Sequence, residues 1–479
     1  MTIAVLPIAN GFYNSESLPI SAQECTNWYV NLVGTVGLNQ ETLLPTPGLT
    51  QLATSGSGKA NSNRGSWVMN EVPYFVNGAS LYRLESDKTT LTNLGTITGT
   101  GRVEMSDNGT QLFILAPGST STGYIFTADP DTLTTIVDAD FNANGEPQTV
   151  RFVDGYFSLT TSDKKFIVSA LNDGLSYDAL DFGSAEANPD KTVTQMPFRN
   201  QLYICGSETI EAFQNIGGAD FPFQRTGLFI MKGVFAPGSI VNANDAFMFI
   251  GGGKGESPAV WAVSQSEPQK ISTTAIDVEL QKLTEAELNS ITSWSYAQKG
   301  AYFTGFNLPN TTFVFDTITG KWHERKSQIT TEDVQLTIAS RVASIAIAYG
   351  EVLCGDSQDG RIGQLDDEPS EYGSDIIRTV STQPFQNNMQ SLFFPWIELT
   401  VESGTGNATE TDPVMRMSIS RDGGKTYSDS RTRAMGKIGE YNKRLIWRRN
   451  GRIPRFAVLK FTTSSQVKTA IIQLTADVV

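Results

Sequence analysis

The chain has 479 residues and a formal net charge of −14, from 36 Lys and Arg against 50 Asp and Glu, a balance that argues against a protein that coats nucleic acid with its whole surface. Three cysteines stand far apart without CxxC spacing, at positions 25, 205 and 354, so we expect neither a disulfide framework nor a zinc site. The 39% of hydrophobic residues can fill cores in two or three domains, and the many Gly, Ser, Thr, Asn and Asp residues predict an all-β fold of short strands and tight turns.

The first 60 residues predict an extended N-terminal arm, because Gly, Pro, Ser and Asn are frequent there and regular periods are few. Whether this arm completes a blade of the following domain is left open. Residues 1–11 have no basic n-region, and Pro7 breaks their short apolar run, which is not typical of a signal peptide. Since no stretch reaches membrane-spanning length, we expect a protein made in a cytoplasm, with no membrane insertion.

Between residues 61 and 370 a strand, turn and strand unit recurs. Its hydrophobic strands lie at 73–76, 111–115, 156–159, 201–204, 246–250, 301–303 and 351–354. Turn signals such as Asp154-Gly155 precede them, with residues that tolerate the positive φ of hairpins. Each of these strands is followed by a partner strand, and these partners lie around positions 82, 125, 167, 211, 261, 314 and 363. Successive partners are 43, 42, 44, 50, 53 and 49 residues apart, which is typical of four-stranded blades. The units predict a β-propeller of about seven blades, with two antiparallel sandwiches as the alternative.

One stretch departs from the strand rhythm. Residues 273–291 place Ile276, Leu280 and Leu283 at helical spacing, and Thr284 with Glu287 forms a capping-box pattern. We predict a short helical insertion near residues 274–291 that lies over one face of the propeller. Contact with a partner protein is the alternative.

Residues 375–479 predict a separate β-sandwich. The segment from Arg416 to Lys460 carries thirteen basic and three acidic residues, so its charge is +10 and the rest of the chain carries −24. Such a segment could dock acidic protein surfaces or phosphate backbones, although a solvated basic face explains it equally well. The candidate docking residues are Arg431, Arg433, Lys443, Arg444, Arg448, Arg449, Arg452 and Arg455.

His323, the only histidine, lies in the motif KWHER on the return strand of a predicted hairpin. Alternation along a strand sends Trp322 and Glu324 to one face and His323 to the other. Catalysis of the Ser-His-Asp or Cys-His kind would depend on this one imidazole. We interpret it as a solvent-facing or packed strand residue, which is the commoner situation.

Two acidic patterns have structural explanations as well. The acids at positions 356, 359, 366 and 367 lack EF-hand spacing, and we interpret Asp359-Gly360 as a type I′ turn. Ser420 to Tyr427 matches the Asp box of sialidase-like proteins, which is most often a folding element. It raises glycan processing as an alternative function, although no pair of catalytic acids can be identified from the sequence.

Several motifs together resemble the tail hub proteins of short-tailed phages, a family also called packaged-DNA stabilisation proteins. They are CTNWYVN (25–31), PTPGL (45–49), GSETIEAFQNIGGADFPFQR (206–225), ISTTAI (271–276), TGKWHER (319–325), SISRDGGKTYS (418–428) and RLIWRRNGRIPR (444–455). Their order and spacing are more specific than any one motif. The motif residues that we expect to serve as scaffold are Cys25, Asn27, Tyr29, Pro47, Gly48, Phe213, Asp220, Phe221, Pro222, Phe223, Arg225, Trp322, His323, Glu324 and Arg325.

The resemblance implies a structural virion protein, with no catalytic residue, metal or cofactor. Proteins of this family form a ring, generally of six copies, beneath the portal and adaptor. They close the channel after DNA packaging, receive the tail needle and support tailspikes or fibres. For this chain the resemblance implies a homohexameric hub in the virion tail, assembled in the bacterial host cytoplasm, through which packaged DNA passes without sequence-specific binding. A glycan-binding or glycan-cleaving propeller adhesin of the phage tail is the alternative.

Overall fold

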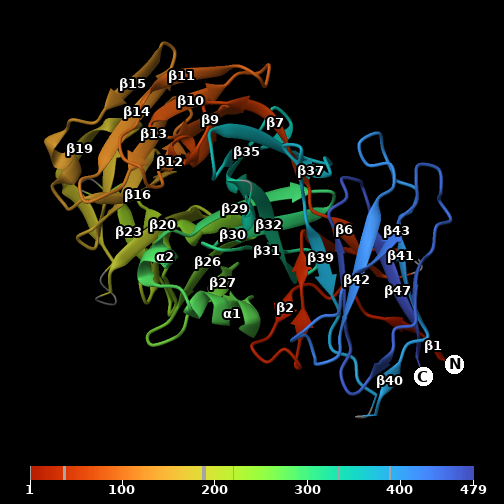
Figure 1. Ribbon diagram of the computed structural model, residues 1–479. Helices are drawn as coiled ribbons and strands as arrows, with labels where there is room; N and C mark the ends of the chain where they lie inside the picture. Colours follow the sequence, from red (N-terminus) through yellow and green to blue (C-terminus); the bar gives the residue numbers. More distant parts are fainter. Residues whose placement is uncertain are drawn as a thin grey trace.

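The computed structural model describes residues 2–35, 39–185, 190–218, 221–332, 334–387 and 390–478. The chain forms an elongated molecule with two β-rich lobes (Figure 1). A propeller makes up the first lobe and a β-sandwich the second, and both chain ends lie at the sandwich. The predicted all-β fold of a propeller followed by a sandwich is confirmed.

Seven sheets form the blades of the propeller within the described residues. The first strands of neighbouring blades contact one another around most of the ring and are therefore the inner strands. From inner to outer strand, the first blade has β8 (Asn63–Met69), β9 (Val72–Asn77), β10 (Ser80–Leu84) and β11 (Leu91–Thr96). The second blade has β12 (Glu104–Asp107), β13 (Gln111–Ala116), β14 (Thr122–Ala128) and β15 (Asp131–Thr135). The third blade has β16 (Pro147–Val153), β17 (Tyr156–Thr161), β18 (Lys165–Ala170) and β19 (Asp173–Ser184).

The remaining four blades follow the same order, except that two short strands share the inner position of the fifth blade. They are β20 (Thr192–Phe198), β21 (Gln201–Gly206), β22 (Ile210–Asn215), β23 (Phe223–Ile230); β24 (Gly233–Val234) and β25 (Val241–Ala243), β26 (Ala246–Gly252), β27 (Ala259–Val263), β28 (Pro268–Lys270); β29 (Thr292–Gln298), β30 (Ala301–Asn307), β31 (Thr312–Asp316), β32 (Lys321–Thr331), with β33 (Val334–Ala339) as an added edge; and β34 (Val342–Ala348), β35 (Glu351–Asp356), β36 (Arg361–Asp366).

The hydrophobic runs of the sequence arise because each blade is buried on both faces. On β13, Leu112 and Ile114 pack into the core shared with the first blade. Their neighbours Phe113 and Leu115 point the other way, into the core shared with the third blade. A strand that faces apolar neighbours on both sides therefore reads as a continuous apolar run and not as an alternating one.

The ring is closed by a strand from the N-terminal arm. β7 (Gly48–Thr54) pairs antiparallel with β36 and supplies the outer strand of the seventh blade, with Thr54 opposite Arg361 and Gly48 opposite Asp366. The first and last parts of the propeller sequence are thereby held in one sheet. Backbone hydrogen bonds between β7 and β36 therefore close the ring.

The arm also builds part of the sandwich. One sheet of the sandwich has the order β44 (Leu445–Arg448), β41 (Trp396–Val401), β47 (Ile471–Val478), β6 (Glu41–Pro45) and β5 (Trp28–Leu32), and β1 (Thr2–Leu6) also pairs with β47. The facing sheet contains β39 (Arg378–Ser381), β46 (Val458–Thr463), β42 (Val414–Ser420) and β43 (Arg431–Ala434). Three strands of the arm therefore belong to the C-terminal lobe.

A short arm strand joins the two lobes directly. β4 (Cys25–Thr26) pairs in parallel with β32 of the sixth blade, through Thr26 and Glu324, and antiparallel with β39 of the sandwich. The sheet of the sixth blade thus continues through the arm into the sandwich. A single hydrophobic core also runs across the junction, with side chains from the arm, the fifth and sixth blades and the sandwich.

The remaining elements are short. They are the strand pairs β2 (Tyr13–Asn14) with β3 (Ala22–Gln23), β37 (Ser370–Glu371) with β38 (Ser374–Asp375) and β40 (Leu392–Phe393) with β45 (Arg452–Ile453), the helices α1 (Thr274–Gln281) and α2 (Glu285–Asn289), and the 3-10 turns Lys59–Asn61, Ala139–Asn142 and Pro237–Ser239. α2 begins with the expected capping box, in which Thr284 and Glu287 each bond the other's backbone amide. The part of the chain that the structure describes contains no helix long and apolar enough to cross a membrane.

The expected type I′ turn at Asp359-Gly360 is wrong. Such a turn needs positive φ at both central residues, and neither residue has it. Gly360 is instead a place of close approach, because a Cβ there would lie 2.3 Å from Ser55 Oγ and 2.8 Å from the Gly56 carbonyl oxygen. The glycine makes room for the arm, and no local sequence signal shows that another segment passes there.

Gly48 has the same role at the start of β7. A Cβ at this position would lie 2.2 Å from the carbonyl oxygens of both Glu368 and Ser370. We expect Gly48→Ala to lower the free energy of unfolding by about 1–3 kcal/mol, because no side-chain rotation relieves overpacking against a backbone. Urea unfolding followed by tryptophan fluorescence measures the loss. Gly34→Ala is the control, since a Cβ there meets no atom within 4 Å; equal losses in the two variants would contradict the close approach.

Candidate functional site

Asn27 makes three side-chain hydrogen bonds where the two lobes meet. Its side chain is buried, and its Nδ2 donates to the carbonyl oxygens of Lys326 and Ile377, each at 2.8 Å, while its Oδ1 accepts from the Lys326 amide at 3.0 Å. The residue adopts a φ of 57°, a conformation that asparagine tolerates better than most residues. One amide group therefore ties the arm to the sixth blade and to the segment that enters the sandwich.

The residues beside Asn27 are buried as well. The Cys25 thiol donates to the Trp28 carbonyl oxygen at 3.3 Å, and burial raises the pKa of this thiol to about 12. Burial also raises the pKa of Tyr29 to about 12. A thiol that stays protonated is a poor nucleophile, so the motif CTNWYVN has a packing role.

β32 places the residues of KWHER on two faces, as the alternation predicts. Trp322 packs against Phe315 and donates its indole N–H to the Ile271 carbonyl oxygen at 2.9 Å. On the same face, Glu324 accepts from the Thr26 hydroxyl of the arm at 3.1 Å. His323 and Arg325 point the other way, toward the seventh blade.

His323 is a packed ring. Only 2% of the residue is exposed, and its ring lies 5.6 Å from that of Phe303. Arg325 Nε lies 3.3 Å from His323 Nε2, which accepts the hydrogen bond. Burial, with the nearby Arg325 charge, holds the pKa of His323 well below its usual range. An imidazole whose free lone pair is occupied and whose protonation is disfavoured is poorly suited to act as a general base.

Arg325 is held by aromatic rings. Its guanidinium lies 5.0 to 5.4 Å from the ring centres of Trp294, Tyr296 and Phe303, and it donates to the Tyr296 hydroxyl at 2.7 Å. Cation–π attraction of this kind gains strength where water is excluded. The side chain therefore belongs to the packing between the sixth and seventh blades.

The other motif residues lie between the third and fourth blades or at the start of β7. Phe213 and Phe221 both contact the ring of Phe166, with ring centres 4.9 and 5.4 Å away. Arg225 forms an ion pair with Glu211 at 3.1 Å. Pro222 and Phe223 are buried and Pro47 is partly buried, whereas Asp220 lies outside the described residues.

The Asp box forms a turn. Asp422 accepts from the Thr426 hydroxyl at 2.6 Å and from the amides of Thr426 and Lys425 at 2.9 and 3.0 Å. These hydrogen bonds, that of the hydroxyl first, lower the pKa of Asp422 to about 2. Because the Asp422 carboxylate already accepts hydrogen bonds from its own turn, it serves as a folding element. Among the described side chains, no three His, Cys, Asp or Glu residues gather as a metal site requires.

The candidate docking residues lie along one margin of the sandwich, where β43 and β44 form the outer edges of the two sheets. Arg431 and Arg433 project from β43 and donate to carbonyl oxygens of β44, those of Arg448 at 2.9 Å and Ile446 at 2.7 Å. These two arginines therefore satisfy open backbone groups of an edge strand. This structural role was not foreseen from the sequence.

The candidates differ in whether their charge is neutralised. Arg444 pairs with Glu398 at 2.5 Å and Lys443 with Glu440 at 3.7 Å. Seven arginines of this margin have no carboxylate within 4 Å across the described ranges, and we call them the basic edge: Arg421, Arg431, Arg433, Arg448, Arg449, Arg452 and Arg455. Burial, and then the charges of Arg433 and Arg421, lower the pKa of Arg431, so the group carries unrelieved repulsion.

The space that the inner strands of the propeller line, which we call the funnel, holds a second group of charges. Arg102, Glu104 and Arg151 come from the connection before β12, from β12 and from β16, and Glu104 forms ion pairs with both arginines. No motif in the sequence marks these three residues, because three separate blade segments bring them together. The one feature that could have indicated them is their position on or next to the inner strands, which line the centre of the ring.

Comparisons with known proteins agree with the order of the lobes. A family model described as bacteriophage P22 Gp10, beta-propeller, matches residues 4–370, and a second, described as bacteriophage P22 Gp10, beta-sandwich, matches residues 377–479. The tail hub protein gp10 of Salmonella phage P22 is 25% identical over 285 residues, 58% of this chain and 58% of that protein. The match thus spans somewhat more than half of the relative's length.

Solved structures give weaker likenesses. The WD40 propeller domain of Doa1 is 14% identical, with 66% of this chain and 97% of that chain covered and a TM-score of 0.38. The computationally designed Ika8 protein is 12% identical, with 66% and 99% covered and a TM-score of 0.35.

The packing of His323 predicts a particular pH dependence. Because its folded pKa is depressed, the unfolded chain binds the proton first, and stability is lost as the pH falls below the unfolded value near 6.5. We expect His323→Gln to lose less stability than the unsubstituted chain between pH 7 and pH 5, by about 2 kcal/mol. Urea unfolding at the two pH values measures this difference, in which the other titrating groups cancel. Identical pH dependence in both proteins would mean that the imidazole takes up its proton in the folded protein with the same pKa as in the unfolded chain.

Proposed function

The chain belongs to the phage P22 Gp10 family, and we propose that it is a structural subunit of the tail hub of a short-tailed phage. The observation that carries this proposal is the succession of the two family matches, which together run along nearly the whole chain in the order of the two lobes. In this role the protein acts by holding other components in place and needs no catalytic residue.

The finer role follows the family. We propose a ring of identical subunits, six by family resemblance, below the portal and adaptor. The ring closes the channel after packaging, receives the tail needle and anchors tailspikes or fibres. Packaged DNA passes through without sequence-specific binding, and the −24 charge outside the basic segment favours passage, since like charges repel.

The basic edge is our candidate for docking the adaptor or a neighbouring subunit. In the described chain none of its seven arginines has a carboxylate within 4 Å, whereas the chain as a whole has a formal net charge of −14. Opposite charges on two surfaces accelerate encounter and fix their register. The Asp box and the abundance of acidic residues were the sequence support for a glycan-processing adhesin, and Asp422 of the Asp box is occupied by its own turn.

Locating the protein in the particle tests the hub proposal. We would label phage particles with gold-conjugated antibody against the purified chain and locate the gold by electron microscopy. A hub gives gold at the single tail vertex, close to the capsid. Gold only at distal spikes would support an adhesin, and accessible particles without gold would refute a virion role.

The docking role of the basic edge can be tested separately. We expect the triple variant Arg448→Glu, Arg449→Glu, Arg452→Glu to fold with an unchanged Tm but to abolish tail assembly, because it inverts the charge of an exposed surface. Complementation of a phage that lacks this gene, with particles counted by electron microscopy, measures assembly. The control reverses Lys191, Arg199 and Lys254, which are exposed on the propeller. Normal particles from the first variant would exclude the basic edge as a docking surface.

A further inference from the structure

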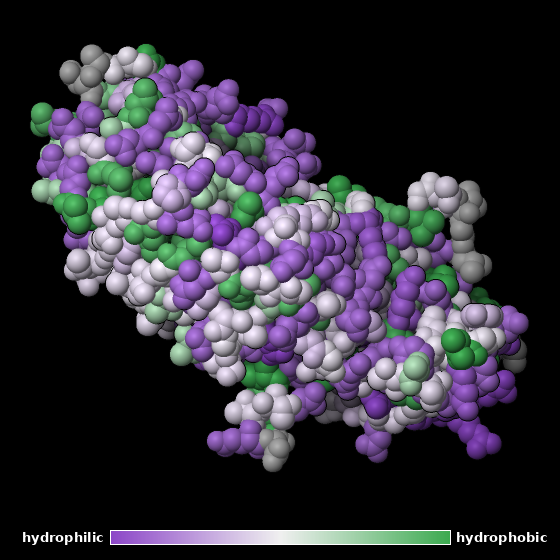
Figure 2. Space-filling model, turned by 90° about the horizontal axis from the view of Figure 1, so that it is seen from above, coloured by the Kyte–Doolittle hydropathy of each residue, from purple (hydrophilic) through white to green (hydrophobic). Residues whose placement is uncertain are grey.

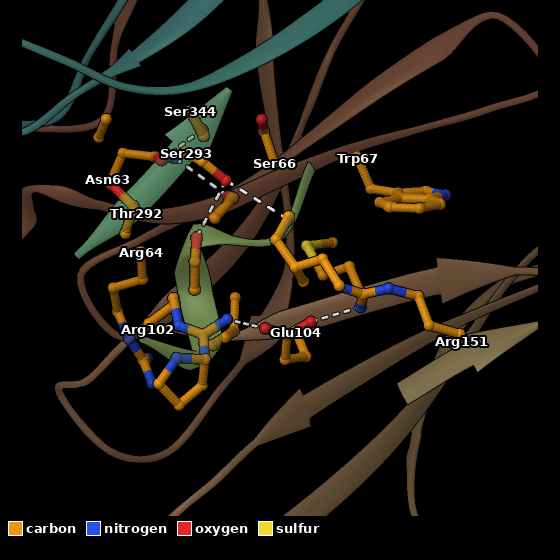
Figure 3. Close-up of a pocket in the computed structure, with 17 residues that line it drawn as sticks. Asn63, Arg64, Ser66, Trp67, Arg102, Glu104, Arg151, Thr292, Ser293 and Ser344 are labelled. Atoms are coloured by element: carbon orange, nitrogen blue, oxygen red, sulfur yellow. Dashed lines mark hydrogen bonds and ion pairs between the residues drawn. The ribbon is translucent and has the colours of Figure 1, made fainter. Parts of the chain in front are cut away.

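The inner strands of the propeller line a funnel that consists of two adjoining spaces, a small chamber and a wider mouth. The chamber has a volume of about 190 Å³ and is lined by residues of β8, β12, β16, β29 and β34 (Figure 3). It shares Arg64 and Arg102 with a wider mouth of about 670 Å³, which the end of α2 also lines. The mouth has the size of an ordinary small-ligand pocket.

The funnel is positively charged in a protein that is acidic overall. Among the residues that line the mouth, Lys59, Arg64 and Arg102 are cationic, and none is Asp or Glu. The chamber adds Arg151 and one acid, Glu104. Four cations therefore face one carboxylate, in a chain with a formal net charge of −14.

Two of these cations are used by the fold. Arg64 donates to four carbonyl oxygens, those of Gly78, Ile97, Thr98 and Gly101, at 2.6 to 3.3 Å. Lys59 Nζ donates to the Ser357 carbonyl oxygen at 2.5 Å. Their hydrogen bonds fix the backbone at the rim, while their charges still contribute to the field in the funnel.

Arg102 has donors to spare. Within the described chain its guanidinium contacts no acceptor other than Glu104, a residue whose side chain is only 5% exposed and is shared with Arg151. One carboxylate does not use the donors of two guanidinium groups. Burial lowers the pKa of both arginines to about 10, so both stay charged at neutral pH.

The chamber wall offers one further free donor. Ser66 Oγ on β8 is buried and has no hydrogen-bond partner in the described structure, although it borders the same space as Arg151 (Figure 3). Buried hydroxyl groups nearly always form hydrogen bonds, so a buried hydroxyl without a partner indicates a place for an acceptor. Glu104, the one acid, is already engaged by both arginines.

We propose that the funnel of this propeller is a binding site for a small oxyanion, a carboxylate or phosphate group held by the free donors of Arg102, with Ser66 and Arg151 on the wall of the same chamber. Guanidinium groups bind such oxyanions through paired hydrogen bonds. A space of about 190 Å³ accommodates a single anionic group. The site does not depend on the tail hub role.

Titration calorimetry on the full chain tests the proposal, with citrate, inorganic phosphate and an end-blocked tetraglutamate peptide as probes. We expect saturable binding at one site per chain for at least one probe. Arg102→Gln should weaken it at least tenfold, because it removes the unpaired donors, and Ser66→Ala should weaken it less. Arg444→Gln, which alters an exposed arginine on the sandwich, should leave it unchanged.

The probes also distinguish the source of the anion. Tighter binding of the peptide than of citrate would mean that the group is presented by a protein segment, and the reverse order would mean a free metabolite or ion. Glu104→Gln provides a second measurement, since it leaves two partly buried arginines without a counter-charge. We expect citrate or phosphate to raise the Tm of that variant more than that of the unsubstituted chain. Absence of saturable binding with all three probes, or binding that Arg102→Gln leaves unchanged, would overturn the proposal.

Discussion

Main-chain pairing of the first 54 residues with strands hundreds of residues away holds this molecule together. β1 lies on β47, β4 joins β32 to β39, and β7 completes the sheet of β36. Each of these pairings satisfies an edge that would otherwise expose open backbone groups. Neither the propeller ring nor the sandwich is complete without the arm. The contacts are far apart in sequence, so folding must close long loops before they form.

The same pairing makes the two lobes into one body. Asn27 bonds to the sixth blade and to the segment that leads into the sandwich, and one hydrophobic core runs through the arm, the blades and the sandwich. The view from above shows the two lobes as one elongated body with a mainly hydrophilic face, on which hydrophobic residues are scattered (Figure 2). A molecule built in this way keeps the funnel and the basic edge at a fixed separation.

The sequence predicts the types of element well and their partners poorly. The apolar runs such as Gln111 to Leu115, repeated at intervals in the forties and fifties, predict the blades because both faces of each blade are buried. The lone His323 was interpreted as a solvent-facing or packed strand residue; alternation along β32 places it opposite Trp322 but does not say that both faces are buried, as they are in the structure. The partner of β7 could not be predicted, since its pairing depends on a segment 300 residues away. Gly360 was misread for the same reason, and the funnel charges come from three separate blade segments.

Hydrogen exchange of the intact chain tests directly whether the arm is a structural member of both lobes. Peptic peptides from residues 25–54 report on β4 to β7, and peptides from β36 and β47 serve as the internal reference. If the arm holds the lobes together, its amides exchange as slowly as those of its partner strands. Protection from exchange is then lost in the arm and in its partner strands at the same denaturant concentration. Rapid exchange in residues 25–54, with β36 and β47 still protected, would show that the propeller and the sandwich are stable without the arm.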